Sequence, residues 1–271
     1  MTGRLRDSGI RRLKQNNRHM LEIFMPDGLQ KFGDGWKVSV RVRPIHANIR
    51  HMLGKSDEWN TEELGIPISS AHVGYAISSF SARLLRHIER LGASFNEEER
   101  RSFMAILRYS GYLMGIPESI LFRDEQEALE IFKIGGLCEP PPSMESIELA
   151  SSLINSAPLF LHKTGADRRK LANYIWQVSR ALIGDTLADE LMFPKHSTLG
   201  VLFKFRLLNR IELIMNRLNP KAYEASNNLT AILDVSMTRQ GSATSYRTIY
   251  TPNNPANGRK KSCYIAWLFP N

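Results

Sequence analysis

Apolar side chains recur at intervals of three and four positions along most of this 271-residue chain. On an α-helix this spacing places them on one face, whereas a half-buried strand would alternate apolar and polar residues. Alternating segments are scarce, and turn sequences such as Met25-Pro26-Asp27-Gly28 separate the helical ones. The pattern therefore predicts an all-α fold.

The domain organisation follows from where this periodicity ends. No Pro/Gly/Ser-rich linker divides the first 220 residues, which favours one domain. Beyond Pro220 the periodicity fades, and residues 241–262 are polar, basic and rich in turn formers. We predict a single multi-helix domain over residues 1–220 and an irregular C-terminal extension over residues 221–271.

Several helix boundaries can be predicted from local signals. Helices are expected over residues 36–53, 65–91, 118–132, 144–154, 167–183 and 198–218, with Gly92 closing the second of them. Asn96 with Glu99 three positions later predicts a capping box at the start of a further helix. Pro44 lies inside the helix expected over residues 36–53, where it should cause a bend or a local break.

His46 lies one turn after Pro44, on or beside an apolar stripe of that helix (Val38, Val42, Ile45, Ile49 and Met52). A haem iron requires a neutral imidazole in an apolar slot. Arg43 and Arg50 stand three before and four after it, where two guanidinium groups could pair with haem propionates. A single histidine on an apolar face is also compatible with a hydrogen-bonded core residue, so spacing alone does not decide its role. His19 and His72 fit surface or helix-cap positions better.

Charge and motif content narrow the function classes. The formal net charge of +9 favours anionic partners: nucleic acid, lipid headgroups or propionates. Walker, GxGxxG, HExxH, GxSxG and kinase signatures are absent, and Cys138 and Cys263 form no metal or disulfide pattern. The basic residues lack interleaved aromatic residues, so no specific nucleic-acid binding is expected. With no signal peptide or membrane-spanning stretch in the sequence, we expect a cytoplasmic protein with peripheral membrane contact left open.

Four segments in series resemble the mpaB/rubber-oxygenase (latex-clearing protein) family of haem oxygenases. Each matches a family block in order and spacing over about residues 4 to 135: Arg11-Arg12-Leu13-Lys14-Gln15-Asn16, Arg41-Val42-Arg43-Pro44-Ile45-His46-Ala47-Asn48-Ile49-Arg50, Gly65-Ile66-Pro67-Ile68 followed by Phe80-Ser81, and Arg108-Tyr109-Ser110-Gly111-Tyr112-Leu113-Met114-Gly115. The second segment is similar to the family's VR-x-x-HA-x-(I/V)-R block.

The resemblance implies a globin-like haem b pocket with His46 as axial ligand and Arg43 and Arg50 beside it. It also implies Arg12 near the distal side. The family's distal Lys-Thr is replaced by Gln15 and Asn16, and "PIN-Q" by Pro67-Ile68-Ser69-Ser70. The glutamate proposed as the family's catalytic base would precede residue 1, so we expect the chain to begin inside the family domain or to belong to a branch without that base.

Three functional hypotheses follow. The first is a haem-dependent oxidoreductase of dioxygenase type, which the resemblance implies would use O2 to cleave carbon–carbon double bonds of an apolar, isoprenoid-type substrate. The second is a non-catalytic helical binding or scaffold module, to which the altered positions Gln15 and Asn16 lend weight. The third, a basic nucleic-acid-binding protein, ranks last.

Overall fold

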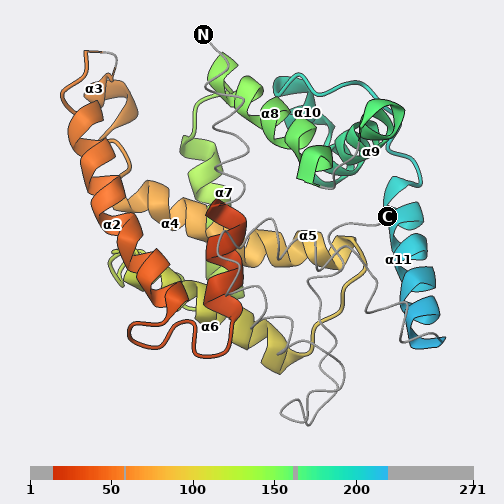
Figure 1. Cartoon of the computed structure of the whole chain (residues 1–271). Helices are drawn as coiled ribbons and strands as arrows, with labels where there is room; N and C mark the ends of the chain where they lie inside the picture. The colour runs from red at the N-terminus through yellow and green to blue at the C-terminus, as the bar shows by residue number, and fades with distance from the viewer. Residues whose placement is uncertain (1–14, 58, 161–163, 219–271) are drawn as a thin grey trace. The chain divides into compact units, whose positions relative to one another are not determined.

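A computed structural model describes residues 15–57, 59–160 and 164–218. Every regular element within these ranges is helical, which confirms the predicted all-α fold (Figure 1). The predicted C-terminal extension, residues 221–271, lies outside the described residues, and the extent of the 1–220 domain stays a prediction. The helices group into two compact units: a first unit of His19–Glu89 with Ser94–Pro140, and a second unit that takes the rest of the chain.

The first unit surrounds one hydrophobic core. Its elements, after a helix over residues 15–24 that leads into it, are α2 (Asp34–Leu53), α3 (Thr61–Leu64), α4 (Ser70–Ser78), the π-helical turn η1 (Ser79–Arg83), α5 (Leu84–Arg90), α6 (Glu97–Leu113) and α7 (Glu125–Cys138). α4, η1 and α5 follow one another without interruption from Ser70 to Arg90, so the helix predicted over residues 65–91 forms, but it begins five residues later than predicted. The core is formed by Ile23, Ile77, Ala82, Met104, Leu107, Ile116, Leu121, Phe122 and Ala128.

Two helix starts show how local side chains set the boundaries. The capping box predicted at the start of α6 is confirmed, because Asn96 and Glu99 exchange hydrogen bonds with each other's backbone amides. The prediction of a helix over residues 118–132 was wrong in its bounds. Asp124 caps the amide of Glu127 and starts α7 later, while the preceding turn buries Leu121 and Phe122 in the core.

Helix α2 differs from its prediction in two respects. It continues as one α-helix through Pro44, so the local break is absent. Pro44 is exposed, so water can donate the hydrogen bond that the carbonyl one turn earlier cannot receive from a proline. The apolar stripe is also not buried along its length, because Ile45 is 49% and Met52 60% exposed. The fully buried positions of α2 are Gly35 and Ser39.

The second unit contains α8 (Met144–Phe160), α9 (Gly165–Ile183), α10 (Asp185–Glu190) and α11 (Val201–Leu218). Trp176 and Phe193 meet edge to face with ring centroids 4.5 Å apart, against the fully buried Ala188. The buried Arg180 donates to the carboxylates of Asp185 and Asp189 and so joins α9 to α10. None of the described helices has the length and apolarity needed to cross a membrane.

Candidate functional site

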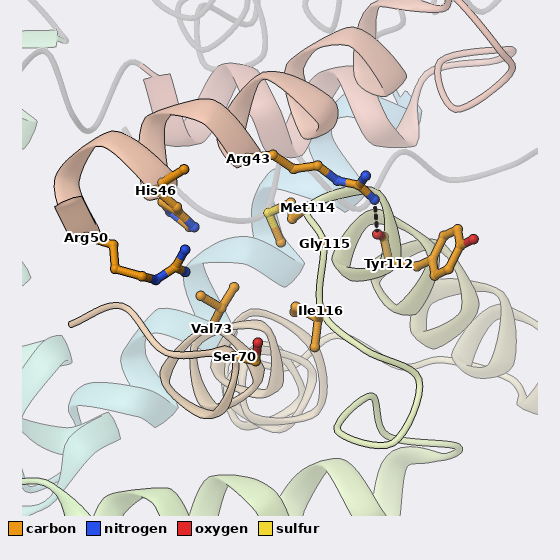
Figure 2. Close-up of a pocket in the computed structure, with 10 residues that line it drawn as sticks. Arg43, His46, Arg50, Ser70, Val73, Tyr112, Met114, Gly115 and Ile116 are labelled. Atoms are coloured by element: carbon orange, nitrogen blue, oxygen red, sulfur yellow. Dashed lines mark hydrogen bonds between the residues drawn. The ribbon is translucent and has the colours of Figure 1, made fainter. Parts of the chain in front are cut away.

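A cavity of about 490 Å³ opens in the first unit between α2, the start of α4 and the segment that follows α6 (Figure 2). This volume lies within the ordinary range of small-molecule sites. Its lining combines apolar side chains with two arginines and a histidine. The lining residues are Arg43, His46, Ala47, Arg50, Ser70, Val73, Tyr112, Met114, Gly115 and Ile116.

Arg43 ties α2 to the end of α6. Its Nε donates to the carbonyl oxygen of Leu113 at 2.7 Å and its Nη2 to that of Tyr112 at 3.0 Å. These carbonyls belong to the last turn of α6, the negative end of the helix dipole, where a cation is favoured. Gly115 follows with φ of 95°, and a Cβ there would come within 3.3 Å of the Arg43 Nε. The close approach of Arg43 therefore depends on glycine at this position.

Arg50 holds the turn that leads into α4. Its Nε donates to the carbonyl oxygen of Pro67 at 3.2 Å and its Nη2 to that of Ile68 at 2.6 Å. Ile68 has φ of 46°, a left-handed conformation that costs a branched residue about 1–2 kcal/mol. Two charge-assisted bonds from Arg50 therefore fix a strained turn at the edge of the cavity.

His46 is half-buried, and Figure 2 shows its imidazole directed from α2 toward the cavity beside Arg50. Among the described residues, neither ring nitrogen has a hydrogen-bond partner. Burial lowers the pKa of His46, and the nearby charge of Arg50 lowers that pKa further. The neutral imidazole is therefore favoured, which leaves the lone pair of one ring nitrogen available to a metal ion.

His19 takes a structural role. Its Nε2 lies 2.9 Å from the Ser39 Oγ and 3.4 Å from the Ser110 Oγ, and the two hydroxyls are 3.1 Å apart. Ser39 also donates to the carbonyl oxygen of Gly35. This network joins the helix over residues 15–24 to α2 and α6. Burial lowers the pKa of His19, which favours the neutral ring that such a network needs.

The predicted site residues thus fall into two groups. His46, Arg43 and Arg50 are brought together around one cavity. Gln15 and Asn16 are exposed and belong to the second unit, and Arg12 lies outside the described residues, so their catalytic role stays a prediction. His72 bonds Ser69 at the start of α4, as expected for a helix-cap histidine.

Sequence reasoning did not single out the apolar wall of the cavity. That wall is formed by Val73 on α4 and by Met114 and Ile116 just after α6. A signal was present, since Met114 belongs to one of the four family-like segments and Val73 lies between the two parts of another. Tyr112 lines the cavity, but Figure 2 shows its ring directed away from it.

The residues around the cavity fit haem b. A neutral, unpartnered imidazole is the iron ligand such a group takes from a protein. Each guanidinium has five N–H donors and uses two on backbone carbonyls, which leaves donors for a propionate on both Arg43 and Arg50. The described residues contain no cluster of three or more His, Cys, Asp and Glu side chains suited to a metal ion.

Comparison with known proteins defines the class of this protein, because a family model for an oxygenase catalytic domain matches residues 2–211. The chain belongs to this family, described as ER-bound oxygenase mpaB/B'/Rubber oxygenase, catalytic domain. A Rubber oxygenase from Streptomyces sp. (strain K30) is 25% identical over 103 residues, which are 37% of this chain and 24% of that relative. The chain therefore matches about a quarter of the relative's length. No solved structure matches.

Proposed function

We propose that the protein is a haem b-dependent oxygenase in which His46 holds the iron. The observation that carries the proposal is the His46 imidazole, which faces a cavity of about 490 Å³ without a hydrogen-bond partner among the described residues. Its lowered pKa favours the neutral form, which is the form that binds iron. Family membership supports the same assignment, because the family model is that of an oxygenase catalytic domain.

Arg43 and Arg50 are proposed to hold the two propionates of the haem. Both guanidinium groups are already fixed by backbone carbonyls, so their remaining donors are preorganised for a carboxylate. A bound propionate would therefore need little rearrangement of either side chain. Both arginines are better described as positioning residues than as free cations, because each also stabilises the cavity wall.

The apolar part of the cavity lining is suited to an apolar substrate. Val73, Met114 and Ile116 present aliphatic and thioether surface that disfavours water. When bound, the haem would supply the activation of O2. By similarity to the rubber oxygenase relative, we propose oxidative cleavage of a carbon–carbon double bond in an isoprenoid-type substrate. A catalytic role for Arg12, Gln15 and Asn16 is part of the proposal and rests on the family resemblance alone.

The test is the visible spectrum of the full chain purified with haem supplied. Wild-type protein should show a Soret band, and His46→Ala should lose it. His51→Ala is the matched control, because His51 is an exposed histidine of the same helix. Imidazole added to His46→Gly should restore the band, since the free base can fill the ligand position.

Three outcomes would reject the proposal. If the wild-type protein takes up no haem, the scaffold hypothesis replaces the oxygenase. An unchanged Soret band in His46→Ala would remove the histidine from the iron. Haem uptake without consumption of O2 in the presence of polyisoprene or a short isoprenoid would leave a haem-binding module and reject catalysis on this substrate class.

A further inference from the structure

Helix α11 is apolar on two opposite faces, and the described structure covers only one of them. Val201, Phe205 and Asn209 are buried on one face of this helix, which packs against α9. The other face exposes large apolar side chains: Phe203 is 65%, Leu207 46%, Ile211 45% and Ile214 56% exposed. Successive members stand four or three positions apart, so they form a single stripe along the helix. Leu199, 92% exposed, extends the stripe just before the helix.

Basic side chains border this stripe on both sides. The helical repeat places Arg206 and Arg210 along one edge and Lys204 along the other. The Nε of Arg206 donates to the carbonyl oxygen of Leu202. The Lys204 ammonium lies 5.9 Å from the centroid of the Tyr174 ring. All three residues are exposed. Residues 201–218 contain four basic residues and one acidic residue, a net charge of +3.

We propose that this face of α11, the α11 stripe, docks the protein on an anionic lipid surface. Exposed apolar side chains would enter the headgroup region, and the flanking cations would remain at the level of the lipid phosphates. Charge selects this occupant over a second copy of the chain. A symmetric dimer through the stripe would place the Arg206, Arg210 and Lys204 of two copies close to one another. The inference does not depend on haem binding and adds a surface that the proposed reaction does not require.

The test is co-sedimentation of the full chain with vesicles of phosphatidylcholine, with and without a minor fraction of phosphatidylserine. The wild-type protein should bind the anionic vesicles and be released by high salt. Phe203→Ser with Leu207→Ser should weaken binding at least about tenfold, because two apolar side chains lose their place in the lipid. Arg206→Gln and Arg210→Gln should each weaken binding roughly fivefold.

Matched controls separate the α11 stripe from exposed residues in general. Leu137→Ser removes a side chain that is 79% exposed on α7, and Arg101→Gln removes an exposed cation of α6. Both should bind as the wild type does. All variants change exposed side chains, so their circular dichroism and melting temperature should match the wild type.

The proposal is overturned if wild-type protein does not bind anionic vesicles, or binds neutral ones equally well. It is also overturned if Phe203→Ser with Leu207→Ser binds normally. Light scattering tests the competing occupant: a wild-type dimer that becomes a monomer in this double variant, without vesicle binding by either, would assign the α11 stripe to a second copy.

Discussion

Replacing Arg50 with methionine should destabilise the first unit before any cofactor is bound. The guanidinium donates to the carbonyl oxygens of Pro67 and Ile68 at 3.2 and 2.6 Å. Methionine keeps much of the aliphatic length of the side chain and removes every donor. The carbonyls at the turn before α4 would then lose both bonds, and the left-handed conformation of Ile68 would lose its restraint.

The magnitude follows from these two bonds. A hydrogen bond to a charged group contributes about 1.5–3 kcal/mol, and partial exposure of Arg50 reduces this toward the lower end or below. We expect a loss of about 2 kcal/mol in the free energy of unfolding, offset in part because the released turn can relax. For a protein of this size the loss corresponds to a fall of roughly 4–8 °C in melting temperature.

The assay is thermal and urea unfolding of haem-free protein, followed by circular dichroism. Arg41→Met is the matched control, because Arg41 is an exposed arginine of the same helix with no described partner, and it should melt as the wild type does. In an Ile68→Gly background the cost of Arg50→Met should shrink by roughly 1 kcal/mol, since glycine adopts the left-handed conformation without help. Unchanged stability of haem-free Arg50→Met would refute the structural role and leave Arg50 as a propionate partner alone.

Two further predictions concern the packing around the site. Burial lowers the pKa of His19 in the folded protein, so as pH falls below about 6.5 the unfolded chain binds a proton at this residue first. The stability that comes from the neutral His19 is therefore complete above that pH and is lost on acidification. Between pH 7.5 and 5 the melting temperature should fall less steeply in His19→Gln than in the wild type, and equal slopes would contradict the role of His19 in the buried network. Gly135→Ala should lower the free energy of unfolding in urea by about 1–3 kcal/mol, since its Cβ would lie 2.4 Å from the ring of Tyr75. The neighbouring Gly136→Ala should stabilise α7 by up to about 1 kcal/mol, because the nearest atom to its Cβ would be 3.8 Å away. Equal effects of the two substitutions would show that α4 and α7 do not pack as described.

Predictions from local spacing succeeded where neighbouring residues decide the structure. The α6 capping box needs only Asn96 and Glu99, and it forms as predicted. The start of α7 was misplaced, because Leu121 and Phe122 match a helical spacing but are held by the core in a turn. The spacing of apolar residues predicts which face of a helix is apolar, but not which other residues bury that face.

The candidate site was likewise predictable from the sequence only in part. Helical spacing brought Arg43 and Arg50 to the neighbourhood of His46, and four ordered segments identified the oxygenase family. Only the tertiary structure revealed that both guanidinium groups are bonded to carbonyls 17 to 70 positions away in the chain. It also showed that Met114 and Ile116 line the same cavity as the histidine. The sequence by itself thus determined the helices and the residue types of the site, since these depend on near neighbours. The cavity and the partners of its cations were decided by contacts between distant segments, which no local pattern encodes.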